Sequence, residues 1–336
     1  MMNLDELLSQ LVERKGSDLF VTVGSPPTLK VNGHLVSLGG EALDKKGALT
    51  LVRDTLSNDH FERYIRTKEA NYAIYREALG RFRVSAFWQQ ELPGMVIRRI
   101  ETRIPTFEDL QLPNILQEVA MAKRGLVLFV GATGAGKSTT QAAMIGYRNQ
   151  HADGHILTVE DPVEFVHQHG RSLVTQREVG IDTESFDVAL KSSLRQAPDV
   201  ILIGEIRSQE TMEFALQFAE TGHLCLATLH ANNANQALDR ILHLVPQDKH
   251  RQFLFDLSFN LKAIVAQQLV PSMDGKRRFA AFEVLLNTPL ITDIIRKGEM
   301  HRLKEVMTKS SELGMQTFDQ ALFTLFCAGQ IGYSEA

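Results

Sequence analysis

The pattern of apolar and polar positions along the first hundred residues switches between the helical and the strand period. A helix is expected first, because leucines and a valine recur at the spacing of one helix face and Asn3 and Glu6 suit a capping box: Leu4, Leu7, Leu8, Leu11 and Val12. Strand-like sequence at 18–23 and 28–38 follows, with the Asn32-Gly33 pair typical of a hairpin turn. A helical stretch at 48–66 and strand-like sequence at 71–99 complete this segment. We predict a small α+β domain.

Prolines mark the end of this segment. Ile104-Pro105 and Leu112-Pro113 favour extended backbone, since proline restricts the residue before it. We therefore expect an N-terminal domain at 1–103, a linker at 104–113 and a second domain at 114–336.

The second domain alternates apolar runs with helical segments, which indicates a parallel sheet with crossover helices. Helical patterns dominate after Lys249, and one example is the series Leu254, Leu257, Leu261, Ile264 and Val265. The Asp274-Gly275 pair suggests a late hairpin. The expected fold class is α/β, with a P-loop core and a small α+β domain before it.

Composition narrows the class of protein. The chain has 336 residues and a net charge of −4, so bulk charge does not favour nucleic-acid binding. Cys225 and Cys327 both lie in apolar sequence and are expected to be reduced core thiols, which favours a cytoplasmic location. No apolar run approaches the roughly 18 residues of a membrane span, so membrane association is expected only by docking to a partner.

The most specific signal is a complete GxxxxGK[ST] motif at residues 131–138, directly after the apolar run 126–130. Its backbone N–H groups are expected to surround phosphate oxygens, Lys137 to reach the β- and γ-phosphates, and Ser138 to hold Mg²⁺. We therefore predict ATP with Mg²⁺ as the ligand. The expected nucleotide-binding residues are Gly131, Thr133, Gly134, Ala135, Gly136, Lys137, Ser138 and Thr139.

Three further apolar runs end in polar residues suited to nucleotide chemistry. Residues 156–159 lead into Glu160, 200–203 lead into Gly204-Glu205, and 223–229 lead into His230. Ligands of parallel sheets bind beyond the carboxyl ends of the strands, so these side chains are expected to meet Lys137 at one edge.

Each of these residues has a candidate role. Glu205 can orient or deprotonate the attacking water, and Glu160 can polarise water or bind Mg²⁺ through it. His230 is a candidate γ-phosphate sensor, whereas His223 opens the same strand and its role stays open. Gly204 stands where this kind of strand usually carries an aspartate, so the metal must rely on other groups.

Phosphoryl transfer also needs cationic groups near the γ-phosphate. The strand-like part of the first domain carries a cluster of arginines: Arg81, Arg83, Arg98 and Arg99. One or more of Arg81, Arg83 and Arg98 could act as an arginine finger across a subunit interface. The alternative is that they pair with carboxylates on a sheet face. Arg195 and Arg207 could link the nucleotide state to the interface.

At this point the sequence resembles the secretion and pilus ATPases of the type II and type IV filament systems. Residues 156–167, 194–207 and 219–230 resemble that family's Asp, Walker B and His boxes, and 80–87 and 16–20 resemble its N-terminal domain. The resemblance runs from about 16 to 320.

The short N-terminal region and the lack of a tetracysteine zinc site resemble the pilus-retraction branch. The resemblance implies a PAS-like N-terminal domain, a RecA-like ATPase domain with a helical C-terminal region, and a homo-hexamer docked to an inner-membrane platform protein. Ala197, Ser208 and the motif at 291–297 depart from the principal retraction ATPase and resemble an accessory paralogue. The resemblance then implies a motor that powers or assists retraction together with the principal retraction ATPase.

Three alternatives stay open at this point. The chain could be a filament-assembly or secretion ATPase of the same family. It could be a nucleotide-binding regulatory subunit with little hydrolysis of its own, which Gly204 and the altered C-terminal motif motivate. A RecA-like DNA motor is disfavoured by the balanced charge.

Overall fold

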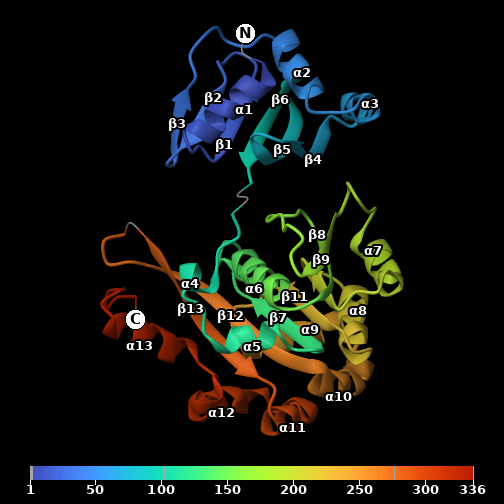
Figure 1. Cartoon of the computed structure of the whole chain (residues 1–336), viewed down its shortest axis with the longest axis vertical. Helices are drawn as coiled ribbons and strands as arrows, with labels where there is room; N and C mark the ends of the chain where they lie inside the picture. The colour runs from blue at the N-terminus through green and yellow to red at the C-terminus, as the bar shows by residue number, and fades with distance from the viewer. Residues whose placement is uncertain (1–2, 101–102, 276, 336) are drawn as a thin grey trace. The chain divides into compact units, whose positions relative to one another are not determined.

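The computed structural model describes residues 3–100, 103–275 and 277–335. The chain divides into two compact units, residues 1–103 and 104–336 (Figure 1). Both units contain a mixed sheet-and-helix architecture, and the α/β class with a small α+β N-terminal unit is confirmed.

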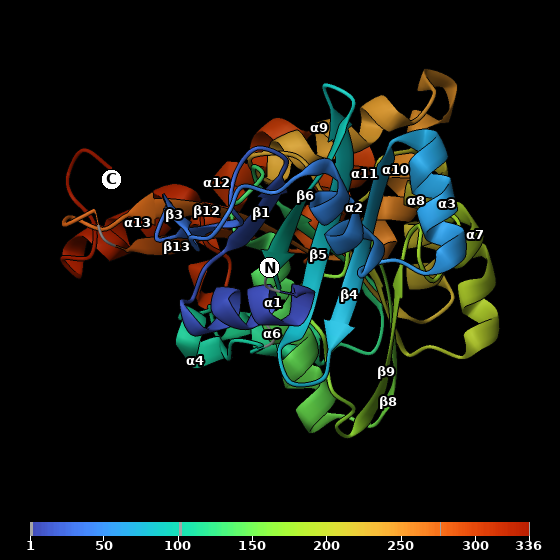
Figure 2. The ribbon, with the colours of Figure 1, turned by 90° about the horizontal axis from the view of Figure 1, so that it is seen from above.

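The first unit contains a six-stranded antiparallel sheet in the order β3-β2-β1-β6-β5-β4. Its elements are α1 (Leu4–Glu13), β1 (Asp18–Thr22), β2 (Thr28–Val31), β3 (His34–Ser37), α2 (Lys45–Arg53), α3 (Asn58–Thr67), β4 (Glu69–Arg76), β5 (Gly80–Gln89) and β6 (Leu92–Arg99). Apolar side chains of all three helices pack with alternate residues of the strands in one core. Figure 2 shows α1 and α2 lying over this sheet.

Local sequence explains most of these elements. The capping box at Asn3 and Glu6 starts α1, as predicted. Asn32 and Gly33 both have positive φ, 50° and 85°, which suits the tight turn between β2 and β3. The helical prediction at 48–66 is wrong in one respect, because the stretch forms two helices. Ser57 starts the second, since its hydroxyl accepts the His60 amide.

The second unit contains a seven-stranded sheet in the order β13-β12-β7-β11-β10-β8-β9, parallel except for the β12–β13 hairpin. Its strands are β7 (Gly125–Val130), β8 (Gly154–Glu160), β9 (Ser172–Glu178), β10 (Val200–Ile203), β11 (Leu224–Leu229), β12 (Leu261–Pro271) and β13 (Arg278–Leu286). Its α-helices are α4 (Phe107–Leu110), α5 (Ile115–Ala120), α6 (Lys137–His151), α7 (Phe186–Ser193), α8 (Gln209–Glu220), α9 (Ala234–Leu244), α10 (His250–Asn260), α11 (Pro289–Lys297), α12 (Leu303–Lys309) and α13 (Phe318–Cys327).

Two apolar cores cover the two faces of this sheet. Leu126, Leu128 and Val130 of β7 pack on the side of α7 to α12. Val127 and Phe129 of the same strand pack on the side of α4, α5 and α6. Because both faces are buried, β7 reads as a continuous apolar run rather than an alternating one. The layers are visible around the central strands in Figure 1.

The structure corrects three expectations. The prolines predict a linker at 104–113, yet this segment belongs to the second unit, contains α4 and buries Phe107. The helical spacing at 254–265 crosses an element boundary, because α10 ends at Asn260 and β12 begins at Leu261. Cys225 is buried as expected, but Cys327 is exposed on α13. The hairpin at Asp274-Gly275 is confirmed by the pairing of β12 with β13.

The membrane question has a direct structural answer for the part of the chain that is described. No helix in it has both the length and the apolar character needed to cross a bilayer.

Candidate active site

Four neighbouring strands end at one edge of the second sheet. β11 lies between β7 and β10, β8 pairs with the other side of β10, and all of these pairings are parallel. Glu160 is the last residue of β8, and the segments that follow the other three strands carry Lys137, Glu205 and His230. The prediction that these strands share an edge is therefore confirmed, whereas the chemical roles of the side chains stay predictions.

The loop after β7 has the backbone of a phosphate cradle. Gly131, Gly134 and Gly136 have φ of 151°, 79° and 88°, a region that favours glycine. A Cβ at Gly131 would lie 2.5 Å from the Gln267 carbonyl oxygen, so no side chain fits there. The loop is therefore held in its curled form by both conformation and close packing.

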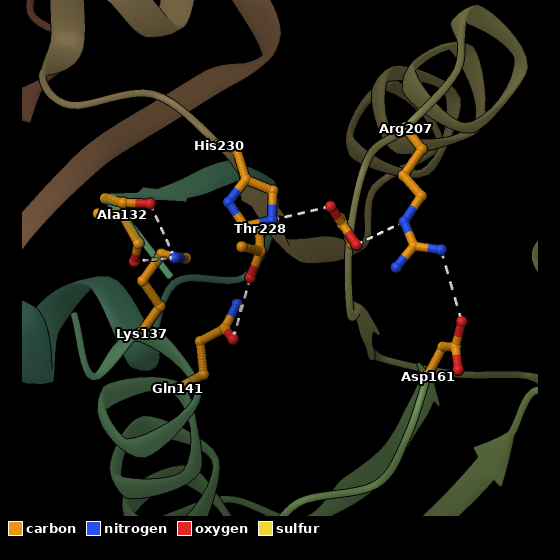
Figure 3. Close-up of polar contacts among 9 residues, drawn as sticks. Ala132, Lys137, Gln141, Asp161, Arg207, Thr228 and His230 are labelled. Atoms are coloured by element: carbon orange, nitrogen blue, oxygen red, sulfur yellow. Dashed lines mark hydrogen bonds and ion pairs between the residues drawn. The ribbon is translucent and has the colours of Figure 1, made fainter. Parts of the chain in front are cut away.

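Lys137 is buried inside this loop. Its Nζ donates to the carbonyl oxygens of Gly131 and Ala132, each at 2.8 Å (Figure 3). Burial lowers the pKa of the Lys137 ammonium, and the negative charges of Glu205 and Glu164 oppose this shift. An ammonium has three donors, so Lys137 keeps one for an incoming phosphate oxygen and can exchange the other two.

The same loop leads into α6, which begins at Lys137. The N-terminus of a helix favours phosphate, and Ser138 and Thr139 place hydroxyl groups in its first turn. The Ser138 hydroxyl at the start of α6 is an oxygen ligand next to the place of the phosphates, and Mg²⁺ prefers oxygen ligands that include phosphate oxygens, so this position fits a magnesium ion.

A chain of polar contacts joins three of the strand ends. His230 Nε2 lies 2.8 Å from Oε1 of Glu205, and Arg207 Nε donates to Oε2 of the same carboxylate. Arg207 also lies 3.5 Å from the carboxylate of Asp161. Figure 3 shows this line of side chains crossing from the loop after β11 to the loop after β8. The Glu205 carboxylate is thus oriented through both of its oxygens.

The contact with Glu205 limits the hydrogen bonds that His230 can donate to a phosphate. A neutral imidazole that donates from Nε2 has only an acceptor at Nδ1. His230 can therefore donate to a phosphoryl oxygen only when it carries a second proton or after it leaves Glu205. Because 45% of the His230 side chain is exposed, the ring has room to move.

Glu160 ends β8 in a more enclosed position. Its Oε1 accepts from the Thr158 hydroxyl at 2.6 Å and from the Gln176 amide at 3.3 Å. Burial raises the pKa of Glu160 to about 7, although these two hydrogen bonds lower it. A carboxyl group with this pKa can exchange a proton near neutral pH, which suits a general base.

Close packing of two strand ends explains why residue 204 is a glycine. Its amide donates to the carbonyl of Val159 at 2.8 Å, and a Cβ there would lie 3.1 Å from Cα of Glu160. The ends of β10 and β8 are therefore so close that an aspartate at this position would press on the backbone of Glu160.

Sequence reasoning missed several polar residues below the loop. Gln141 lies one turn after Lys137 and accepts from the Thr228 hydroxyl at 3.2 Å, with both side chains buried (Figure 3). Thr140 donates to the side chain of Gln267 at 2.8 Å. The signal for Gln141 was its helical spacing from Lys137, whereas Gln267 comes from a distant strand that the pattern did not predict.

A cavity of about 440 Å³ adjoins the loop at Gly136 and Thr139. Leu110, Leu112 and Leu269 are among the residues that line it. Polar and charged residues, Arg278 and Gln267 among them, share the lining, and a mixed lining next to the phosphate cradle suits the base of a nucleotide.

Three of the four clustered arginines of the first unit share one face of its sheet. Arg83 and Arg98 are direct cross-strand partners on β5 and β6, and Arg81 lies two residues before Arg83. Arg99 pairs with buried Phe82 and belongs to the opposite face. Arg98 Nε donates to Oδ1 of Asp18 at 2.7 Å, so it forms the carboxylate pair that was the alternative to a finger role.

The position of His223 answers the question left open for it. The residue precedes the start of β11, at the end of the strand opposite His230. Its Nδ1 lies 3.0 Å from the Thr221 hydroxyl and 3.1 Å from the Phe218 carbonyl. These contacts belong to the end of α8 and place His223 away from the candidate site.

Comparisons with known proteins agree with this geometry. Residues 4–316 match the family described as Type II/IV secretion system protein. The chain is 59% identical over 335 residues to the type IV pilus ATPase PilU of Pseudomonas aeruginosa, covering all of this chain and 88% of that one. It is 37% identical to the retraction ATPase PilT of the same organism, covering all of this chain and 97% of PilT.

Solved structures give the same result for the fold. A crystal structure of the pilus retraction motor PilT with bound ADP has a TM-score of 0.94 and 36% identity, and the match covers all of this chain and 96% of that chain. The ATPase DotB of Legionella pneumophila follows at a TM-score of 0.86 and 25% identity, covering 99% of this chain and 94% of that chain. The chain belongs to the Type II/IV secretion system protein family and, within it, to the PilT- and PilU-like type IV pilus ATPases.

Proposed function

We propose that this chain hydrolyses ATP as a subunit of a hexameric motor that powers or assists type IV pilus retraction. The observation that supports this most strongly is the shared edge at which the parallel strands β7, β10 and β8 lead to Lys137, Glu205 and Glu160. The relatives named PilU and PilT supply the biological setting.

The chain's own side chains divide the work of hydrolysis. Lys137 leaves its contacts with the loop carbonyls and binds the β- and γ-phosphates. Glu205, oriented by His230 and Arg207, accepts the proton of the attacking water. Glu160, whose pKa is about 7, takes up a proton from a neighbouring water molecule or releases one to it.

Magnesium is the cofactor that this arrangement requires. Bound with ATP, the ion would neutralise charge on the phosphate oxygens, with Ser138 as its ligand from the protein. The cavity beside Gly136 and Thr139 would hold the adenine base.

Arg81 and Arg83, and Arg98 if it leaves Asp18, are proposed to act in trans. On their shared sheet face they can add positive charge to that of Lys137 at the γ-phosphate. The ring would lie in the cytoplasm, peripheral to the inner membrane, in contact with a pilus platform protein and the principal retraction ATPase.

A regulatory subunit that binds nucleotide but hydrolyses little is the second candidate. Both oxygens of Glu205 are already engaged by His230 and Arg207, and Gly204 leaves no room for the usual aspartate. In that case the chain would modulate the principal retraction ATPase through mixed assembly.

Phosphate release by the purified chain tests the proposal. We expect Mg²⁺-dependent release by the chain alone, together with a hexamer mass in the presence of ATP. If the chain binds ATP but releases phosphate only when the principal retraction ATPase is added, the regulatory candidate is supported instead. A chain that neither binds nor hydrolyses ATP would contradict both.

A further inference from the structure

A buried carboxylate outside the nucleotide site joins two helices. Glu283 lies in β13 with 7% of its surface exposed. Its Oε1 accepts the backbone amide of Ala234, the first residue of α9, at 2.8 Å. It also accepts a backbone hydrogen bond from Phe318, the first residue of α13.

These two hydrogen bonds satisfy backbone amides that the N-cap side chains of α9 and α13 do not reach. The side chain of Asn233 accepts the amide of Gln236, and Thr317 accepts that of Gln320. Glu283 takes the first amide of each helix, so one side chain completes both N-termini. A negative charge is also favourable at this end of each helix.

The position of Glu283 connects the C-terminal helices to the site. α9 begins four residues after His230, so its N-terminus fixes one end of the turn that carries this imidazole. Glu283 is the register partner of Ala266 on β12. Ala266 is in turn the register partner of Val130 on β7, the residue before the phosphate loop. The carboxylate therefore lies in the same register as the start of that loop.

We propose that Glu283 is a positioning residue, which ties the His230 turn to α13 and so sets the contact between His230 and Glu205. It touches neither nucleotide nor water. The inference rests on the proposed ATPase function for its kinetic part only, since the tie between the two helices can be measured without nucleotide.

The charged neighbours of Glu283 define a matched control. Lys304 and Asp319 both lie close enough to influence it, and they pair with each other at 2.8 Å on the surface. Asp319 is the second residue of α13 and its side chain is 72% exposed. Asp319→Asn therefore removes a carboxylate from the same helix terminus without touching the amide of α9.

The test compares Glu283→Gln with Asp319→Asn in the full chain. Glutamine keeps the volume of Glu283 but replaces one acceptor oxygen with a donor, so one helix amide loses its partner. We expect amide hydrogen exchange to rise about five- to tenfold at the start of α9 (231–236) or at the start of α13 (317–320), whichever amide faces the new NH2 group, as for loss of a helix cap. We also expect kcat to fall about tenfold with an unchanged KM for ATP.

Two results would overturn the inference: unchanged exchange at both 231–236 and 317–320 in Glu283→Gln, or equal effects of Asp319→Asn. A Glu283→Gln chain that fails to fold is replaced by Glu283→Asp, whose shorter side chain should raise exchange in the same segments. Loss of phosphate release in the unaltered chain would contradict the proposed function instead, and the exchange comparison would still decide whether Glu283 holds this turn.

Discussion

His230 Nε2 lies 2.8 Å from Oε1 of Glu205, which makes the imidazole the orienting partner of the candidate base. The two residues follow adjacent strands, β11 and β10, whose register brings their carboxyl ends together. The sequence predicts that both residues lie at one sheet edge, but not that they are in direct contact, because they are 25 positions apart. The relationship leads to a test of His230 that separates orientation from phosphate sensing.

Glutamine at position 230 can keep a donor near the place of Nε2, whereas leucine cannot. We expect His230→Gln to retain a measurable part of the phosphate-release rate and His230→Leu to lose about 10²-fold, the usual scale for acid–base support. Fluorescent-nucleotide binding should be similar in both variants. Equal loss of turnover in the two variants would show that His230 does more than orient Glu205.

The raised pKa of Glu160 predicts that the free energy of unfolding depends on pH. Burial raises the pKa of this carboxyl group from its ordinary value of 4.5 to about 7, so the folded state holds the proton more tightly than the unfolded state. The stabilisation is therefore complete below pH 4.5 and is lost as pH rises to about 7. Glu160→Gln cannot ionise and should escape this loss.

Urea unfolding at pH 5 and pH 8 measures this effect. Relative to the unaltered chain, Glu160→Gln should gain about 2 kcal/mol in unfolding free energy between the two pH values. Glu220→Gln is the control, because it removes an exposed carboxylate at the end of α8 that does not influence the pKa of Glu160. A pH response of Glu160→Gln identical to that of the unaltered chain would contradict the raised pKa.

Gly204 predicts a packing effect. A methyl group there would lie 3.1 Å from Cα of Glu160 and 3.2 Å from the carbonyl oxygen of Val159, both backbone atoms that yield little. We expect Gly204→Ala to destabilise the chain by about 1–3 kcal/mol, the usual range for overpacking, and to slow turnover by moving Glu160. Gly332→Ala, whose Cβ meets nothing closer than 3.7 Å, serves as the neutral comparison in thermal unfolding. Equal midpoints for the two variants would remove the packing explanation.

Much of the fold could be predicted because its strands are buried on both faces. Val200–Ile203 and residues 126–130 contain no polar position, and each leads directly into chemistry-bearing residues. Periodicity failed where two elements meet without a break. Leu257, Leu261 and Ile264 keep helical spacing across the junction of α10 and β12, and only the extended backbone at Leu261 (ψ 133°) marks the change.

The candidate site could be predicted as far as motifs and strand ends reach. The sequence placed Lys137, Glu205 and His230 at one edge, but it could not predict that Arg207 and His230 would both hold Glu205. Glu283 was beyond sequence reasoning, since a carboxylate in a late strand resembles any other until the fold sets α9 beside it.

Glu205 is the group that activates water in the proposed mechanism, and its exchange for glutamine tests this role most directly. The measurement is phosphate release by Glu205→Gln beside fluorescent-ATP binding by the same protein. We predict binding within about threefold of the unaltered chain and phosphate release lowered at least 10²-fold, because the amide cannot accept the proton. Near-normal phosphate release by this variant would contradict the account.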